Sequence, residues 1–262
     1  MYRSEDKDGF RHYCKEEGGV KYPSVTSILS KYEDRQYLEQ WIRLNGEPYA
    51  EFIRRYTADI GTETHLQIEK AAPINEYACA IWDAFYSSMV ITDSEQTIWY
   101  EDGKVRFAGS YDSKGFVPED YFQLRSSKSS KASWRKMASG SAIIDLKTKA
   151  LKPDVEWKLQ SGKIPRIDNT SFTLKNLIQV STYASIEEVD YAIVAYVAKL
   201  KTKMKTHLLL LTKPEIQYYS KIFYNLCLDY FNHKELSVSW EELIEHSSTN
   251  YLPYTMQLCS TS

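Results

Sequence analysis

The sequence predicts an α/β fold, with a small mixed β-sheet flanked by helices in a single domain. Apolar residues recur mainly at helical spacing up to about residue 89. Short β-branched and aromatic segments, typical of strands, follow from about residue 90. Beyond them, a segment with a helical pattern precedes two further strand-like segments, as happens where helices cover a sheet. The 262 residues suffice for one large hydrophobic core, so we expect one domain over 1–262.

The composition is that of an ordinary globular protein. Hydrophobic residues make up 43% and charged residues 26% of the chain, which excludes a disordered or collagen-like protein. The formal net charge of -2 gives no overall attraction to nucleic acid, so any phosphate binding must come from local basic patches. The charged stretch "MYRSEDKDGF" and the lack of about 18 consecutive apolar residues predict no membrane partner and a cytoplasmic location.

The cysteines are far apart in the sequence and form no pair at metal-ligand spacing. Neither a disulfide framework nor a zinc or iron–sulfur site is therefore expected. We expect reduced, mostly buried thiols at Cys14, Cys79, Cys227 and Cys259.

The portion over 1–89 is expected to be mainly helical. In "YPSVTSILSKY", Pro23 ends an extended segment and Ser24 can cap a short helix. Helical patterning returns after Asn45-Gly46, in "EPYAEFIRRYTADIGTETHLQIEKA". A further helix is expected in "NEYACAIWDAFYSSM", where the apolar residues lie three or four apart.

The sheet core is expected over 90–212. The helical pattern of "SFTLKNLIQVSTYASIEE" lies between the third and fourth of the expected strand segments. "KPEIQYYSKIFYNLCLDYF" begins a helical C-terminal portion, expected over 213–262. The strand segments are "VITDSEQTIWY", "KVRFAGSYDSKGFV", "SAIIDLKTK", "DYAIVAYVAKL" and "THLLLLT".

A basic, serine-rich segment over about 113–141 is expected to be a mobile insertion in this core. Its middle reads "RSSKSSKAS", and basic residues outnumber acidic ones along it. Such a segment can grip or steer DNA through its phosphates, or it can be only a solvated loop. The candidate DNA contacts are Lys128, Lys131, Arg135 and Lys136.

Two charged residues interrupt an otherwise apolar strand in "SAIIDLKTKA". Asp145 and Lys147 lie two residues apart, so both project from the same face of the expected strand. Burying two charges costs several kcal/mol unless each finds a partner or a metal ion. The alternative is a solvent-exposed ion pair on an edge strand, which contributes little to stability.

Further polar residues lie at informative spacing elsewhere in the chain. "GTETH" ends in His65, and Glu69 follows one helical turn later on the same helix face. "AGSYD" ends in Asp112 at the end of an expected strand. In "QVSTY", Gln179 and Tyr183 are four residues apart and share one side of their expected helix.

In this order, on helix, strand, strand and helix, these motifs resemble the PD-(D/E)XK nuclease superfamily, and within it the RecB-like branch. The "YPSVTSIL" segment is similar to the opening of exonucleases from phages and from mitochondrial genome maintenance. The resemblance runs from about Tyr22 to Tyr183. Its most specific parts are the strand with "IDLK" and the helix with "QVSTY".

The resemblance implies a restriction-endonuclease-like core and a metal site. The acidic pair of the family corresponds to Asp112 and Asp145, which would bind one or two Mg²⁺ or Mn²⁺ ions together with the backbone carbonyl of Leu146. His65 matches a histidine ligand of the RecB-like branch, and Glu69 is a further candidate ligand. Hard oxygen ligands suit these ions, which supply the charge stabilisation and the deprotonated water that phosphodiester hydrolysis needs.

The other motif residues would act beside the metal. Lys147 would orient or deprotonate the attacking water, or stabilise the transition-state anion. Gln179 would organise the lysine, the water or the metal ligands, and Tyr183 would meet the nucleic acid. Each also has a plainer possible role. Gln179 can simply form hydrogen bonds with the backbone, and Tyr183 can be one of 21 tyrosines that mostly pack in the core. His65 taken alone is more often a core or surface histidine than a ligand.

The long connection between Asp112 and Asp145 departs from the family pattern, which joins these acids by a tight hairpin. This departure weakens the assignment of Asp112 as the first acid of the pair. Asp102 and Asp120 are nevertheless poorer substitutes, because neither follows the "AGSY" strand. Relatives with an iron–sulfur cluster group their cysteines near the C-terminus. Cys227 and Cys259 form no such group, so no cluster is expected.

The expected function is that of a Mg²⁺- or Mn²⁺-dependent DNA exonuclease, acting on single-stranded ends in replication, recombination or repair. The resemblance to phage enzymes places it in the cytoplasm of a bacterial or phage-infected cell, with DNA as partner and protein partners unspecified. One alternative is an endonuclease of the same superfamily. Another, from a different class, is a DNA-binding module that keeps the fold without catalysis.

Overall fold

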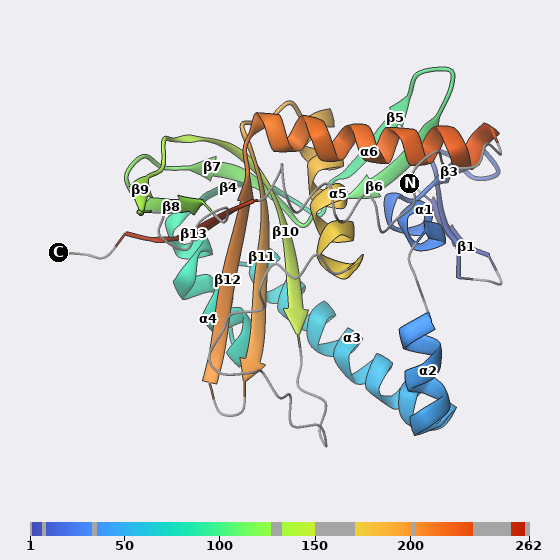
Figure 1. Cartoon of the computed structure of the whole chain (residues 1–262), viewed down its shortest axis with the longest axis horizontal. Helices are drawn as coiled ribbons and strands as arrows, with labels where there is room; N and C mark the ends of the chain where they lie inside the picture. The colour runs from blue at the N-terminus through green and yellow to red at the C-terminus, as the bar shows by residue number, and fades with distance from the viewer. Residues whose placement is uncertain are drawn as a thin grey trace.

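A mixed sheet forms the centre of the fold (Figure 1). The computed structural model describes residues 2–6, 9–32, 36–126, 133–149, 171–200, 203–232 and 253–259. Within these ranges the main sheet has 8 strands in the order β4-β7-β10-β11-β12-β13-β8-β9. Its strands are β4 (Val90–Ser94), β7 (Ser113–Val117), β8 (Phe122–Ser126), β9 (Arg135–Lys136), β10 (Gly140–Lys149), β11 (Tyr191–Leu200), β12 (Lys203–Leu211) and β13 (Tyr254–Leu258).

Two smaller sheets and the helices surround this centre. One small sheet contains β1 (Tyr2–Glu5), β2 (Arg11–Cys14) and β3 (Tyr22–Pro23), and the other pairs β5 (Thr97–Glu101) with β6 (Arg106–Ser110). The helices are α1 (Val25–Tyr32), α2 (Gln36–Asn45), α3 (Glu47–Glu69), α4 (Glu76–Ala84), the short 3-10 helix η1 (Tyr86–Ser88), α5 (Ser171–Ile186) and α6 (Lys213–Asn232). None of the described helices is long and apolar enough to cross a membrane.

The middle strands explain why the sheet is mixed. β10 runs parallel to β11, while β7 and β12 pair with these two strands in antiparallel directions. A parallel connection needs a crossover, and α5 lies in the chain between the two parallel strands. The strand pair expected over 190–212 and the helices expected over 171–188 and 213–231 are confirmed by β11, β12, α5 and α6. A mixed sheet flanked by helices is thus the observed α/β architecture.

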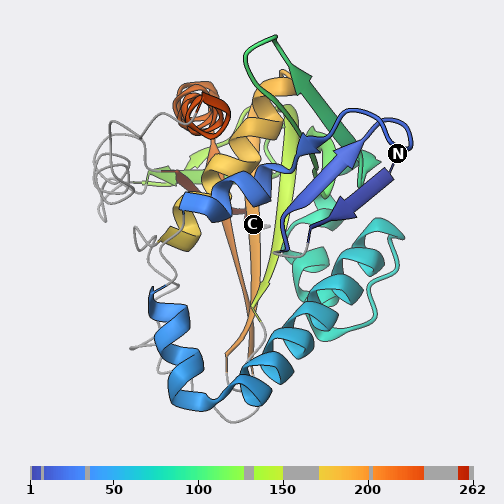
Figure 2. The same cartoon turned by 90° about the vertical axis from the view of Figure 1, so that its right-hand side faces the viewer.

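The two faces of the main sheet are covered by different helices (Figure 2). Ile143 of β10 belongs to a buried cluster with residues of α1, α5 and α6. Its neighbours Ile144 and Leu146 point the other way and join a cluster with residues of α4. Because side chains alternate along a strand, Asp145 and Lys147 share the face of Ile143. Burial of both faces fixes this register, since a shift by one residue would exchange the two sets.

The portion over 1–89 is mainly helical, as predicted, but it begins with a small sheet. Three strands, β1 to β3, precede α1. Tyr13 and Tyr22 are register partners in this small sheet and pack with Ala108 and Trp99. Burial of Tyr13 and Tyr22 against β5 and β6 therefore decides the local structure, and helical patterning begins only at α1.

The basic segment over 113–141 was predicted to be a mobile insertion, and that expectation is wrong for most of the described part. β7 pairs with both β4 and β10, and β8 pairs with β13 and β9. Backbone pairing and the burial of Val117, Phe122 and Leu124 in the core hold these strands in the sheet. Lys128 and Lys131 lie outside the described residues.

The end of the chain also differs from the helical portion expected over 213–262. α6 covers the first part, but β13 then pairs with β12 and β8 in the main sheet. Met256 of β13 is buried in the core cluster on the α4 side. Packing against β12 and β8 determines this strand, and a local pattern could not indicate it.

His207 is expected to make the fold sensitive to acid. It lies on β12 opposite Tyr196 of β11, and its Nε2 atom is buried without a hydrogen-bond partner among the described residues. Burial, with a smaller contribution from the charge of Lys149, lowers the pKa of His207 to about 4. This pKa lies below the unfolded value of 6.5, so the stabilisation is present above pH 6.5 and is lost as pH falls toward 4.

The expected loss is at most about 1.4 kcal/mol per pH unit within this window. Urea unfolding at several pH values measures it. The variant His207→Gln removes the titrating group and should flatten the slope between these two pH values. An equal slope in the variant and the wild type would contradict the assignment.

Candidate active site

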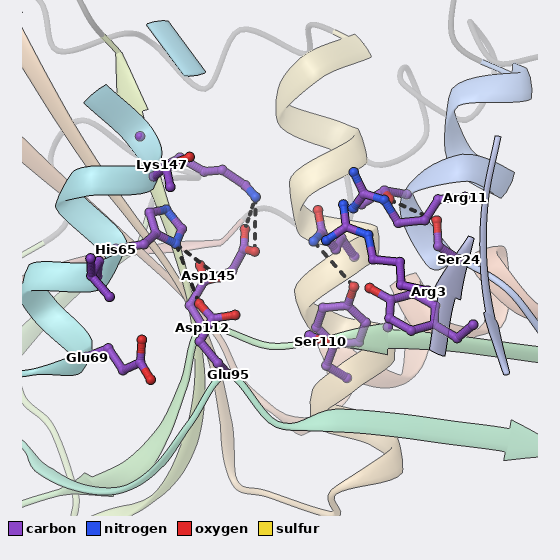
Figure 3. A pocket seen from close by; sticks show the side chains of 18 residues that line it. Arg3, Arg11, Ser24, His65, Glu69, Glu95, Ser110, Asp112, Asp145 and Lys147 are labelled. Carbon is purple, nitrogen blue, oxygen red and sulfur yellow. Dashed lines mark hydrogen bonds and ion pairs between the residues drawn. The ribbon is translucent and has the colours of Figure 1, made fainter. Parts of the chain in front are cut away.

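A cavity of about 620 Å³ opens where α3, β6, β10 and α5 meet the small N-terminal sheet (Figure 3). The predicted residues His65, Glu69, Asp112, Asp145, Lys147, Gln179 and Tyr183 all line it. They come from α3, β10, α5 and the connection between β6 and β7, which are distant in the sequence. The structure therefore brings the predicted side chains to one place.

Asp145 and Lys147 form an ion pair that lines the cavity, with Asp145 buried and the Lys147 side chain 24% exposed. The lysine Nζ lies 3.0 Å from Oδ1 and 2.9 Å from Oδ2 of Asp145. Only Oδ1 accepts a hydrogen bond in good geometry, so Oδ2 is buried without a hydrogen bond in the described structure. The alternative of an exposed pair on an edge strand is wrong, because β10 lies between β7 and β11 and Asp145 is 1% exposed.

The electrostatics of this pair follow from its burial. Burial raises the pKa of Asp145 to about 6, against the opposing charge of Lys147. Burial alone would lower the pKa of Lys147, but the carboxylates of Asp145 and Asp112 raise it above its usual value. The lysine is therefore a cation at neutral pH in this state, and not a free base.

Asp112 occupies the point where β6 ends and β7 begins, beside the middle of β10. Its Oδ2 accepts a hydrogen bond of 2.6 Å from the backbone N–H of Leu146, and its Oδ1 lies 3.3 Å from Nδ1 of His65. The pairing of β7 with β10 ends at Ser113 and Ile144, so the chain leaves room there for a side chain. The connection through β7 to β9 is long, yet it returns to β10 with Asp112 in place.

The carbonyl of Leu146 is accessible to the same group of residues. In an extended strand, the N–H and the C=O of one residue point to the same edge. Since the N–H of Leu146 faces Asp112, its carbonyl also points to the side where β7 has ended. This placement fits the backbone ligand that the sequence motif implies.

Glu95 joins His65 and Asp112 and was missed in the sequence. One ligand atom from each of these three residues lies within 4.8 Å of the others. The Glu95 backbone has a φ of 53°, which is unusual for a glutamate, and its N–H donates to the Asp112 carbonyl. Local backbone strain of this kind often marks a functional position. Nothing in "TDSEQT" except an acid between two strands could have indicated it.

Two carboxylates control the protonation of His65. Burial alone would lower the pKa of His65, but the hydrogen-bonded carboxylates of Asp112 and Glu95 raise it to about 10. Burial would likewise raise the pKa of Asp112, yet His65, Lys147 and the Leu146 N–H hold it below its usual range. Asp112 is therefore ionised and His65 is protonated at neutral pH in the absence of an ion.

Glu69 lies in the wall of the cavity but outside this group. It follows His65 by one turn of α3, as the spacing predicts. Among the described residues, its carboxylate is not part of the cluster of possible ligand atoms, and Glu95 is. Figure 3 shows Glu69 below His65, directed toward the cavity.

Gln179 and Tyr183 support the site from α5. Gln179 Nε2 donates to the Tyr183 hydroxyl at 3.4 Å, and both side chains are buried. The Tyr183 ring lies against β6, where a Cβ added to Gly109 would be 2.6 Å from the hydroxyl oxygen. Tyr183 is 1% exposed, so the structure favours the packing role for it over the predicted contact with nucleic acid.

The two described candidates for DNA contact, Arg135 and Lys136, lie away from the cavity. Arg135 and Lys136 form β9, the edge strand at the far end of the main sheet, and neither lines the cavity. The Arg135 guanidinium stacks over Tyr254, and Lys136 pairs with Asp120 at 3.2 Å. The structure does not bring these two predicted DNA contacts to the site.

The donor set suits a hard divalent cation. Carboxylate and carbonyl oxygens with one imidazole nitrogen are ligands that Mg²⁺ and Mn²⁺ accept. The buried Oδ2 of Asp145, which lies 2.9 Å from Nζ of Lys147 but accepts no hydrogen bond in the described structure, is a further oxygen available to a cation. These residues therefore fit the ion that the sequence motif implies.

Comparison with known proteins adds no identification. No protein-family model matches the chain, and no curated protein matches its sequence. Among solved structures, the crystal structure of SSO0001 is 13% identical, with a TM-score of 0.34, and the match covers 81% of this chain and 77% of that one. A likeness of this strength carries no argument about fold or activity. The functional inference depends on the geometry of the cavity.

Proposed function

We propose that the chain is a metal-dependent DNA exonuclease with a restriction-endonuclease-like core, acting on single-stranded ends. The observation that carries this proposal is the convergence of Asp112, Asp145 and Lys147 at one cavity, with His65 beside them. A strand bearing Asp-x-Lys, a preceding acid at a strand end and a crossover helix with Gln179 form the arrangement that the family resemblance implies. Replication, recombination or repair in a bacterial or phage-infected cell remains the proposed setting.

His65, Glu95, Asp112, Asp145 and the Leu146 carbonyl would hold the ion. A bound Mg²⁺ or Mn²⁺ supplies charge stabilisation for the phosphoryl oxygens and lowers the pKa of a water molecule. The protein contributes a fixed set of oxygens, because Asp112 is anchored on the Leu146 N–H and Asp145 on Lys147.

Lys147 has a separate role in this proposal. In the described structure its ammonium neutralises Asp145. With a cation beside Asp145, the flexible side chain can turn its protons toward a phosphate oxygen or the attacking water. Its raised pKa favours donation to a developing anion over removal of a proton.

Two alternatives remain open as outcomes of the same experiment. An endonuclease of this superfamily would share the cavity and differ in how DNA enters it. A DNA-binding module without catalysis would not require Asp145 and Lys147 to be buried together, because burying an ion pair costs free energy without a compensating function.

The test is degradation of end-labelled linear single-stranded, linear duplex and circular single-stranded DNA with Mg²⁺ or Mn²⁺. The exonuclease is expected to shorten linear DNA only, and the position of the label gives the polarity. Cutting of the circle would identify an endonuclease instead. Binding of DNA without cleavage in either metal would reject the nuclease proposal in favour of a binding module.

Metal affinity is expected to rise with pH, because an ion must displace the proton on His65. The raised pKa of His65 stabilises the metal-free fold fully below pH 6.5, and this stabilisation is lost as pH rises through about 10. Titration calorimetry with Mg²⁺ should therefore show affinity increasing up to about tenfold per pH unit between about pH 7 and 9.

The variant His65→Gln is the control for this pH dependence. It keeps the acids but has no titrating ring, so its affinity should be lower and nearly independent of pH in the same window. A variant as pH-dependent as the wild type would show that another group carries the proton.

A further inference from the structure

The wall of the cavity that faces the acids is basic. Arg3 of β1 and Arg11 of β2 line it, and Figure 3 shows both across the cavity from Asp145 and Lys147. Arg3 pairs in register with Tyr13, which lies two residues from Arg11, so both arginines project from one face of the β1–β2 hairpin. No local pattern indicates this wall, because the residues of the hairpin do not show that it faces α3 and β10.

One cation of the cavity lacks a hydrogen-bond acceptor at one of its nitrogens in the described part of the chain. His65 is matched by Asp112 and Glu95, and Lys147 is matched by Asp145. Arg11 lies opposite Glu5 in the hairpin register, yet its Nε is buried and makes no hydrogen bond within the described residues. A buried guanidinium nitrogen without an acceptor is costly. Arg11 also lines the cavity, where an anionic ligand would offer further acceptors to its guanidinium group.

Arg11 also stands between two cavities. A second cavity, of about 880 Å³, shares Arg11 and Thr26 with the first. Phe10, Lys31 and Tyr230 line this second space, which combines apolar rings with a cation. A chain molecule bound at Arg11 therefore has space on both sides.

We propose that Arg3 and Arg11 form a phosphate-binding subsite, which holds a backbone phosphate of the substrate strand next to the phosphate that is cleaved. A guanidinium is always charged and its planar donors match a phosphate group. The strand continues from this subsite into the second cavity. The inference rests on the proposed function for the identity of the strand, and the two arginines are positioning residues that do not take part in the chemistry.

The test measures binding separately from cleavage. The binding of a fluorescein-labelled oligothymidylate is followed by anisotropy in Ca²⁺ over a range of salt concentrations, for wild type, Arg3→Gln, Arg11→Gln and Arg11→Lys. Each phosphate contact with single-stranded nucleic acid contributes about -0.7 to the slope of log affinity against log salt. Arg3→Gln and Arg11→Gln should each reduce the slope by about that amount and weaken binding about tenfold.

Two further variants control for charge and shape. Lys104 lies in the β5–β6 turn and lines neither cavity. The variant Lys104→Gln removes one positive charge there and should keep the wild-type salt slope. Arg11→Lys keeps the charge and should restore most of the slope, while its affinity stays below that of the wild type because the planar donors are lost. Thermal unfolding of each variant checks the fold, and the exposed Arg3 carries the test if Arg11→Gln is unstable.

The outcomes for the two proposals are distinct. If folded Arg3→Gln and Arg11→Lys bind with wild-type slope and affinity while the wild type cleaves DNA, the subsite is rejected and the nuclease stands. If the wild type cleaves nothing but both Gln variants lose slope, the nuclease is rejected and the phosphate subsite stands. A wild type whose binding does not depend on salt would reject the subsite.

Discussion

Replacing Asp145 with asparagine is expected to reduce the proposed nuclease activity about a thousandfold or more. The change removes a carboxylate from the proposed metal site, and a metal ion there contributes several kcal/mol of transition-state stabilisation. It also leaves the Lys147 ammonium, which lies 2.9 Å from the Asp145 carboxylate, without its partner. Breaking a fully buried pair costs about 3–5 kcal/mol, and because Lys147 is 24% exposed we expect stability to fall by less than that.

The double variant Asp145→Asn with Lys147→Met separates the two effects. Removing the lysine relieves the unpaired charge, so urea unfolding should show much of the lost stability restored, while cleavage of linear single-stranded DNA stays absent. Lys147→Met alone should also be inactive. Substantial cleavage by folded Asp145→Asn would show that the Asp145 carboxylate is not needed for the reaction.

Gly109→Ala is expected to destabilise the protein and disturb the site at the same time. The added Cβ would lie 2.6 Å from the hydroxyl oxygen and 2.7 Å from a ring carbon of Tyr183. Tyr183 is fully enclosed, so it cannot move away freely, and overpacking of this kind costs about 1–3 kcal/mol. Displacement of Tyr183 would also shift Gln179, its hydrogen-bond partner, and lower the catalytic rate.

A double-mutant cycle tests this contact. In Tyr183→Leu the smaller side chain leaves room for the new methyl group, so adding Gly109→Ala should cost less there than in the wild type. Thermal unfolding gives the comparison, at about 2–4 °C per kcal/mol for a chain of this size. Strict additivity of the two substitutions would mean that the clash is relieved elsewhere.

The local elements were predictable because their causes are local. The strand with "IDLK" was predicted from its short apolar, β-branched run and the helix with "QVSTY" from its helical pattern, and β10 and α5 confirm them. Ser24 was recognised as a helix cap, and its Oγ accepts the Ser27 N–H at 3.0 Å at the start of α1. Each of these features depends on residues within one turn or one strand.

Elements that form by distant pairing were misread. β13 exists because β12 and β8 offer it two pairing edges, and β8 lies between β13 and β9. The small N-terminal sheet depends on burial against β6. The residues within these segments do not indicate which strands will lie beside them, so their composition favoured a helix or a loop instead.

The sequence by itself determined which residue types stand at which spacing: Asp145 with Lys147 on one strand face, Gln179 with Tyr183 on one helix face, and His65 on a helix before them. Only the tertiary structure decided that Glu95 replaces Glu69 beside His65, that Tyr183 is enclosed against Gly109, and that Arg3 and Arg11 face the acids. The physical reason is that spacing along one element is fixed by backbone geometry. The meeting of separate elements is fixed by the burial of surfaces that are distant in the sequence.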